Sequence, residues 1–210
     1  MFKKLTFLKV KDKFQNILES FIYYSIGLRQ YDHIFTHLTR SEKIVLHQLA
    51  SKNRKAKNFV EIGSYLGASA CIIASAIKKC PSAFLYCIDT WQNQAMSEGK
   101  RETFSLFLNN ISSFKKQIFT LKGFSNQQVD YFAEHNIKID FLFIDGDHTY
   151  NAVREDFLLY RKYLHPEAII ILHDYGASGV RKVIDQYIKD QVKWEYILPN
   201  MYCCQLRNLP

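Results

Sequence analysis

The sequence predicts an α/β fold in which crossover helices connect the strands of a parallel sheet. From residue 58 onward, apolar runs of strand length alternate with segments of helical periodicity, which is the pattern of successive βα units. Five of the eight glycines lie just beyond predicted strands. The chain ends in two strand-like runs separated by a short turn, which predicts an antiparallel hairpin next to the parallel strands.

Each element of this region has its own sequence signal. The strands are expected at Asn58–Ile62, Phe84–Ile88, Gln117–Leu121, Ile139–Ile144 and Ala168–Leu172. Apolar residues at helical spacing predict helices within Leu66–Ile77, Phe104–Ile111, Val153–Leu164 and Val180–Tyr187. Pro199 and Asn200 separate Lys193–Leu198 from Met201–Leu206, which completes the predicted hairpin.

The first 57 residues have a different pattern. Apolar residues at helical spacing between Phe14 and Leu28 predict an amphipathic helix, and Thr39 with Glu42 has the form of a capping box that begins another. We therefore divide the chain into a helical lead-in, residues 1–57, and an α/β domain, residues 58–210. The aromatic helix Phe14–Tyr24 is a candidate contact in a homo-oligomer or a lid over the site.

The positive charge lies in the lead-in. The 210 residues carry a net charge of +8, yet residues 1–58 hold 12 basic and 4 acidic side chains, whereas residues 59–210 hold 16 of each. Because the α/β domain is neutral, a nucleic-acid partner is not favoured. The five lysines within residues 1–13 alternate with apolar residues and suit an anionic membrane surface, an acidic acceptor or a solvated terminus.

The cysteines and the N-terminus indicate a compartment. Five cysteines without framework spacing favour a reducing environment. The lysines interrupt any apolar segment of a signal peptide, and no apolar run reaches the length of about 20 residues that a membrane span needs. We expect a cytoplasmic protein, with peripheral contact at the inner membrane surface as the variant that residues 1–13 suggest.

The glycines place the chemistry at the carboxyl ends of the strands, where open α/β sheets bind ligands. Gly63 and Gly67 follow the first strand and predict a turn that offers backbone N–H groups to an anion, although an ordinary βα turn has the same residues. Asp89 ends the second strand and suits either a ribose diol or a loop cap. Ser125 lies against an adenine edge or, with Gln128, forms a capping box.

Five motifs occur in one order along residues 58–207. They are Glu61-x-Gly63-x-x-x-Gly67, Ile88-Asp89-Thr90-Trp91, Gly123-Phe124-Ser125, the run from Asp140 to Tyr150, and Ile171-Leu172-His173-Asp174-Tyr175. In this order they resemble class I S-adenosylmethionine-dependent methyltransferases, and within that class the small O-methyltransferase-like family with IDGDH-x-Y and HDY motifs. The resemblance implies a Rossmann-like, doubly wound sheet of seven mostly parallel strands with a reversed last strand, preceded by N-terminal helices.

The same resemblance implies a cofactor site for S-adenosylmethionine. Its residues would be Glu61, Gly63, Ser64, Tyr65, Gly67, Ser69, Asp89, Thr90, Trp91, Gly123, Ser125 and Asp145. The reaction it implies is O-methylation of a hydroxyl on a small molecule or a sugar unit. One departure is visible, because the usual Pro-Gly-Gly turn before the fifth strand is replaced by Pro166-Glu167-Ala168.

Catalysis requires an aligned acceptor and a group that removes a proton from its hydroxyl. The candidates are His148, His173 and Asp145, and we favour His148 as the base because histidine titrates near neutral pH. Asp145 and Asp174 stand where related enzymes bind a divalent cation such as Mg²⁺, but His173 replaces an oxygen ligand. His173 is equally suited to orienting Asp174.

Two other functions compete with this interpretation. Residues 143–149 match the hydrophobic-D-x-D-x-T pattern of haloacid-dehalogenase-like phosphatases, but the motif follows a late strand and Asp174 comes only 29 residues after Asp145. The basic isoelectric point of about 9.1 suggests an RNA-directed methyltransferase or a non-catalytic RNA-binding protein. No base-methylation or RNA-binding motif accompanies that charge. The acceptor's identity has no transferable code in the sequence.

Overall fold

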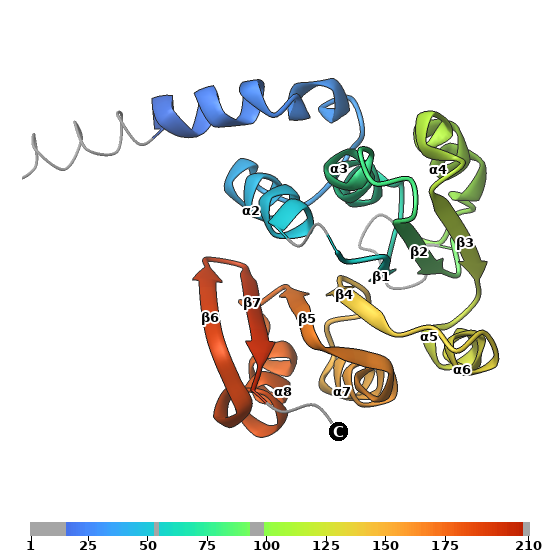
Figure 1. Cartoon of the computed structure of the whole chain (residues 1–210), viewed down its shortest axis with the longest axis vertical. Helices are drawn as coiled ribbons and strands as arrows, with labels where there is room; N and C mark the ends of the chain where they lie inside the picture. The colour runs from blue at the N-terminus through green and yellow to red at the C-terminus, as the bar shows by residue number, and fades with distance from the viewer. Residues whose placement is uncertain (1–15, 53–54, 93–98, 208–210) are drawn as a thin grey trace, which may run out of the picture.

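The computed structural model describes residues 16–52, 55–92 and 99–207 of the chain, so the predicted membrane contact of residues 1–13 lies outside the described part. A single sheet of seven strands runs through the molecule in the order β3-β2-β1-β4-β5-β7-β6 (Figure 1). The strands are β1 Asn58–Ile62, β2 Phe84–Asp89, β3 Ile118–Lys122, β4 Ile139–Ile144, β5 Leu164–His173, β6 Val192–Leu198 and β7 Met201–Leu206.

The strand directions confirm the predicted topology. The first five strands pair in parallel, and β7 pairs antiparallel with both β5 and β6. Strand order runs one way from β1 to β3 and the other way from β4 onward. The loops after β1 and β4 therefore diverge from neighbouring positions, which is where such sheets form a ligand crevice.

Helices cover both faces of the sheet (Figure 1). One buried cluster joins α2 Arg40–Lys52, α3 Ala68–Ile77 and α4 Phe104–Asn110 to one face. The other cluster joins α6 Asp130–Glu134, α7 Tyr150–Tyr160 and α8 Ser178–Tyr187 to the opposite face. Successive strand residues alternate between the clusters, as Phe141 and Leu142 do, because the side chains of a strand point to opposite faces in turn.

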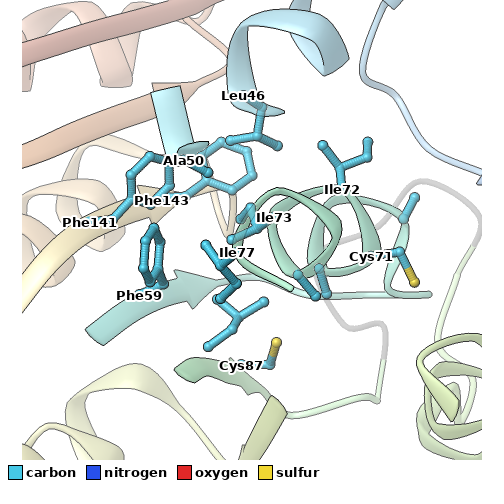
Figure 2. Packing of buried hydrophobic residues seen from close by; sticks show 14 of the residues in the cluster. Leu46, Ala50, Phe59, Cys71, Ile72, Ile73, Ile77, Cys87, Phe141 and Phe143 are labelled. Atoms are coloured by element: carbon cyan, nitrogen blue, oxygen red, sulfur yellow. The ribbon is translucent and has the colours of Figure 1, made fainter. Parts of the chain in front are cut away.

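The lead-in helix α2 is packed onto the sheet. Its N-terminus has the predicted capping box: the Thr39 N–H donates to Glu42 Oε2 at 2.8 Å, and the Glu42 N–H donates to Thr39 Oγ1 at 3.4 Å. Further along, Leu46 and Ala50 are buried in the cluster that contains Phe143 of β4 (Figure 2). The lead-in and the α/β domain thus share one apolar core. Residues 16–25 form another helix before the short 3-10 helix Leu28–Tyr31.

Three details differ from the sequence prediction. The strand expected at Ala168–Leu172 begins at Leu164, and its pairing with β4 shifts between Ile139 and Phe141, so Pro166 lies in an irregular stretch where its missing N–H breaks no ladder. The two short helices α5 Ser125–Gln128 and α6 were not predicted, because they are too short for an apolar stripe. Leu108, an apolar residue of the helix predicted within Phe104–Ile111, is exposed rather than packed on the sheet.

Within the described residues, no helix is long and apolar enough to cross a membrane.

Truncation of Leu46 tests the docking of α2. Its side chain is fully buried, so Leu46→Ala should lower the free energy of unfolding by about 2–5 kcal/mol through lost burial and a cavity. Urea denaturation measures the change, with Gln48→Ala on the exposed side of the same helix as the control. Equal effects of the two substitutions would show that α2 is not packed on the sheet in solution.

Candidate active site

The loops after the strands are held together by backbone hydrogen bonds. The Gly63 N–H donates to the Ile88 carbonyl at 2.9 Å, and the Asp145 N–H donates to the Ile62 carbonyl at 2.8 Å. At the neighbouring strand, the Gly123 N–H donates to the Asp89 carbonyl at 2.9 Å. The ladder therefore continues one residue beyond the strands, and the loops after β1, β2, β3 and β4 begin side by side.

Gly63 is required by the closeness of two backbones. A Cβ atom at this position would lie 2.2 Å from the Asp145 carbonyl oxygen, a distance that no side chain can occupy. The φ angle of +87° adds a second reason for glycine. Gly67 has the same φ and precedes α3, but there an added Cβ would meet the side chains of Phe107 and Ile111 at 3.0 Å.

The Asp89 carboxylate binds the turn that follows β1. Its Oδ2 accepts the N–H groups of Ser64 and Tyr65 at 2.9 and 2.8 Å, and Oδ1 accepts the Trp91 N–H at 2.6 Å. We expected these turn N–H groups to face a bound anion, and two of them face Asp89 instead. An ionised carboxylate has about four acceptor positions, so Asp89 can still accept from a ligand hydroxyl.

Two predicted site residues lie beneath the loops and do not line the cavity. Glu61 is fully buried, and its Oε2 accepts the Ser64 hydroxyl at 2.6 Å. Burial raises the pKa of Glu61 to about 7, against the hydrogen bond from Ser64. The Trp91 indole is buried against Phe104 and Phe107, with ring centroids 4.8 and 4.7 Å away. Both side chains shape the loops from inside.

A cavity of about 920 Å³ opens at this edge of the sheet. This volume is at the upper end of the range of small-molecule sites. The other thirteen predicted site residues line it: Gly63, Ser64, Tyr65, Gly67, Ser69, Asp89, Thr90, Gly123, Ser125, Asp145, His148, His173 and Asp174.

The cavity also has walls that the sequence did not indicate. Phe35, Thr36 and His37 come from the lead-in, Asn126, Glu155 and Asp156 from α5 and α7, and Asn200 from the hairpin turn. The Phe35 ring lies edge-on to His37 and Tyr65, with centroids 5.1 and 6.4 Å apart. No periodicity or motif marks these residues, because tertiary packing alone brings them to the site.

At one end of the cavity, His173 lies among three carboxylates. Its imidazole is almost fully buried, with Nδ1 2.9 Å from Asp145 Oδ1 and 3.4 Å from Asp174 Oδ2. The other nitrogen, Nε2, lies 3.7 Å from Oε2 of the buried Glu42. The lead-in thus contributes a charged group to the site, which the sequence showed only as a capping residue.

The two histidines predicted to be catalytic, His148 and His173, have opposite environments. Burial disfavours a charged His173, but hydrogen bonds and charge from Asp145, Asp174 and Glu42 outweigh it and raise the pKa of His173 to about 12. The hydrogen bond with His173 in turn lowers the pKa of Asp174 to about 2. The His148 side chain is 59% exposed, with Nδ1 3.8 Å from Asp174 Oδ2. Because its pKa is raised, His173, unlike an ordinary histidine, is protonated at neutral pH.

The same cluster has the form of a cation site. One ligand atom from each of Asp145, His173 and Asp174 lies within 4.8 Å of the others. Together with Glu42, the carboxylates outnumber the single imidazole, which leaves excess negative charge in a buried place. Mg²⁺ prefers oxygen ligands, whereas Mn²⁺ and other transition metals also accept imidazole. Asp145, His173 and Asp174 therefore fit a transition-metal ion such as Mn²⁺ better than Mg²⁺.

Ser125 does not form the alternative capping box with Gln128. The helix α5 begins at Ser125, and the Phe124 N–H before it donates to the Gln127 side chain at 3.2 Å. The Ser125 hydroxyl donates to the carboxylate of Asp156 instead. Ser125 therefore faces the cavity from a fixed position.

Substitution of Gly63 tests the contact between the two loops. Gly63→Ala should destabilise the protein well beyond the roughly 1–2 kcal/mol that a left-handed φ costs, because its Cβ collides with the Asp145 backbone. Gly27→Ala is a matched control with φ +76° and nothing closer than 3.6 Å. The free energies of unfolding are compared by urea denaturation, and a Gly63→Ala loss no larger than that of Gly27→Ala would contradict this geometry.

Comparisons with known proteins agree on the fold. The solved structures that are similar to this chain include the following three. The O-methyltransferase TomG from Streptomyces achromogenes, in complex with SAM, has a TM-score of 0.64 and 16% identity over 81% of this chain and 82% of that one. CalS11, a TDP-rhamnose 3'-O-methyltransferase of calicheamicin biosynthesis, has a TM-score of 0.62 and 14% identity over 80% and 81%. A putative caffeoyl-CoA O-methyltransferase from Staphylococcus aureus has a TM-score of 0.65 and 16% identity over 93% and 99%.

Sequence comparison identifies the family. A segment of 37 residues is 54% identical to the uncharacterized protein R132 of Acanthamoeba polyphaga mimivirus, which covers 18% of this chain and 17% of that protein. The sequence profile of the family described as "Methyltransferase domain" matches residues 60–175, more than half of the chain. The matched region includes residues 143–149, which resembled a phosphatase motif, so the phosphatase alternative is wrong. The chain belongs to this methyltransferase family.

Proposed function

We propose that this protein transfers the methyl group of S-adenosylmethionine to a hydroxyl of a small molecule or a sugar unit. The observation that carries the proposal is the cavity between the loops after β1 and β4, which has Asp89 on one side and His148 with Asp174 on the other. The similar structures include an O-methyltransferase bound to SAM and a sugar O-methyltransferase, which supports this reaction class.

The cofactor would lie across the ends of β1, β2 and β3. The turn from Gly63 to Gly67 would hold its methionine part, and the remaining acceptor position of Asp89 would bind a ribose hydroxyl. The adenine of the cofactor would then reach the loop of Gly123 and Ser125, which follows the next strand in the sheet. This order along the sheet edge supports the predicted roles of these residues.

The acceptor would enter from the side of the lead-in. Bound S-adenosylmethionine would supply the methyl group: the hydroxyl oxygen would displace the sulfonium sulfur at the methyl carbon, and the electrons of the broken bond would remain on sulfur. The hydroxyl proton goes to the His148 imidazole, whose Nδ1 side faces Asp174. The carboxylate of Asp174 stabilises the imidazolium that forms. Because His173 is already protonated, its role is to hold Asp145 and Asp174 in place.

A cation-assisted version of the reaction is the second candidate. Asp145, His173 and Asp174 would hold a divalent ion, which when bound lowers the pKa of an acceptor hydroxyl. Glu42 would then hold the other nitrogen of His173, as carboxylates do for metal-binding histidines. The donor set favours Mn²⁺ over Mg²⁺.

The partners and location follow from the lead-in. We infer a cytoplasmic protein whose basic N-terminus contacts anionic membranes or an acidic acceptor. The helix of residues 16–25 supports an additional contact, because Ile17, Phe21 and Tyr24 are exposed on it and lie at helical spacing. The same apolar face suits contact with a second copy of the chain. RNA stays the less favoured acceptor, since the α/β domain has no excess positive charge.

Binding of S-adenosylhomocysteine tests the proposed function. We expect calorimetric titration to show binding, and His148→Ala to keep that affinity while turnover falls about 10²–10⁴-fold for loss of the base. The control is His135→Ala, an exposed histidine away from the cavity. Absence of heat at high micromolar ligand would reject the cofactor, and unchanged turnover would remove His148 from the mechanism.

Metal binding tests the second candidate separately. If it is correct, Mn²⁺ binds the wild-type protein in a calorimetric titration, and Asp174→Asn weakens that binding by tenfold or more. Asparagine tolerates the left-handed backbone at position 174, where φ is +54°, so the fold should survive. Asp185→Asn on the exposed side of α8 serves as the control. Activity that resists chelation, together with no Mn²⁺ binding, would reject the cation.

A further inference from the structure

Asp156 is a buried carboxylate in the cavity wall that no sequence motif indicated. It lies on α7 with 5% of its surface exposed, yet it lines the cavity. Removing a carboxylate from water is unfavourable unless hydrogen bonds replace the lost solvent. The hydrogen-bond partners of Asp156 therefore indicate its role.

One oxygen of Asp156 is used within the protein. Oδ1 accepts the hydroxyl hydrogen of Ser125, and the Ser125 carbonyl in turn accepts the Tyr160 hydroxyl at 2.9 Å. Ser125 is thus held from two sides, and its only hydroxyl hydrogen is already donated. The hydrogen bonds of the described residues provide no donor for the second oxygen, Oδ2.

The second oxygen, Oδ2, lies beside Gly146 in the loop after β4. A Cβ atom added to Gly146 would lie 3.9 Å from Oδ2, so this oxygen lies close to the loop after β4. Gly146 and Ser125 both line the cavity. Among the described residues, Oδ2 is therefore an acceptor without a protein donor, on a residue that lines the cavity together with Ser125.

We propose that Asp156 selects the base of the cofactor, with Oδ2 accepting a hydrogen bond from the 6-amino group of adenine. This inference rests on the proposed function, which places the ribose at Asp89 and the base toward Ser125. A purine with a 6-oxo group would bring a second acceptor oxygen against the carboxylate, and the two would repel. Asp156, rather than the predicted Ser125, distinguishes the two bases.

The charge state of Asp156 fixes the conditions of the test. Burial raises its pKa to about 6, against the hydrogen bond from Ser125 and with a further contribution from the charges of Glu155 and Asp147. At pH 8 the carboxylate is ionised and acts as an acceptor only.

Two ligands that differ at position 6 of the purine provide the test. The full chain is titrated calorimetrically at pH 8 with S-adenosylhomocysteine and with its 6-oxo analogue, S-inosylhomocysteine. The wild type should prefer the amino ligand on the order of 10- to 100-fold, as expected for a hydrogen bond to a charged group. In Asp156→Asn the preference should fall below about threefold, because an amide can accept from one base and donate to the other.

Two further variants separate this role from general damage. Glu155→Gln changes the neighbouring cavity acid, which accepts from Asn126 at 3.2 Å, and should keep the wild-type preference. Ser125→Ala leaves the carboxylate in place and should also keep the preference, even with weaker affinity for both ligands. If Asp156→Asn does not fold, Ser125→Ala decides, because loss of the preference there would assign the selection to Ser125.

The outcomes are distinguishable from those of the proposed function. Binding of S-adenosylhomocysteine without a preference in the wild type overturns the role of Asp156 alone, and so does a full preference in Asp156→Asn. Absence of any binding to the wild type overturns the proposed function and this inference with it.

Discussion

The approach of the Gly63 backbone to the Asp145 carbonyl determines the geometry of the site. No Cβ atom fits between them, so the loops after β1 and β4 touch where the strand order reverses. This contact brings the turn after β1 within reach of Asp89 on one side. On the other side it fixes Asp145 next to His173. A side chain at position 63 would push the two loops apart. The positions of Asp89 on one side and of Asp145 with His173 on the other would then change.

Charge is arranged around this contact in two separate places. Near the acceptor end, Asp145, Asp174 and Glu42 surround one imidazole, and together they raise the pKa of His173 to about 12. Elsewhere in the cavity wall, the buried Asp156 accepts a hydrogen bond from Ser125. The first arrangement favours a protonated imidazole or, as proposed, a divalent cation, and the second would offer an acceptor to the cofactor. The fold thus gathers acids that lie far apart in the sequence, from Glu42 to Asp174, into two separate groups.

The lead-in forms part of the candidate site and is also the source of the basic charge. Through Leu46 it packs on the sheet, through Glu42 it contacts the buried histidine, and through Phe35 it lines the cavity. An acceptor bound in the cavity would therefore meet residues from both parts of the chain. This explains why the acceptor cannot be derived from the motifs, which all lie after residue 58.

The sequence was informative wherever a local rule applies. Alternating apolar runs predicted the strands, and glycines such as Gly63 marked the active edge because a close approach leaves no alternative residue. Residues brought in by tertiary packing, such as Phe35 and Asp156, carry no local signal. Trp91 shows the converse, because a residue within a recognisable motif turned out to be buried beneath the loop. Motifs locate an edge of the sheet, whereas packing decides which side chains face the ligand.

The most direct test of this account is a crystal structure of the protein with S-adenosylhomocysteine. We expect a ribose hydroxyl to lie within hydrogen-bonding distance of the Asp89 carboxylate, with the sulfur near the turn that begins at Gly63. A ligand bound elsewhere, or one whose ribose points away from Asp89, would contradict it.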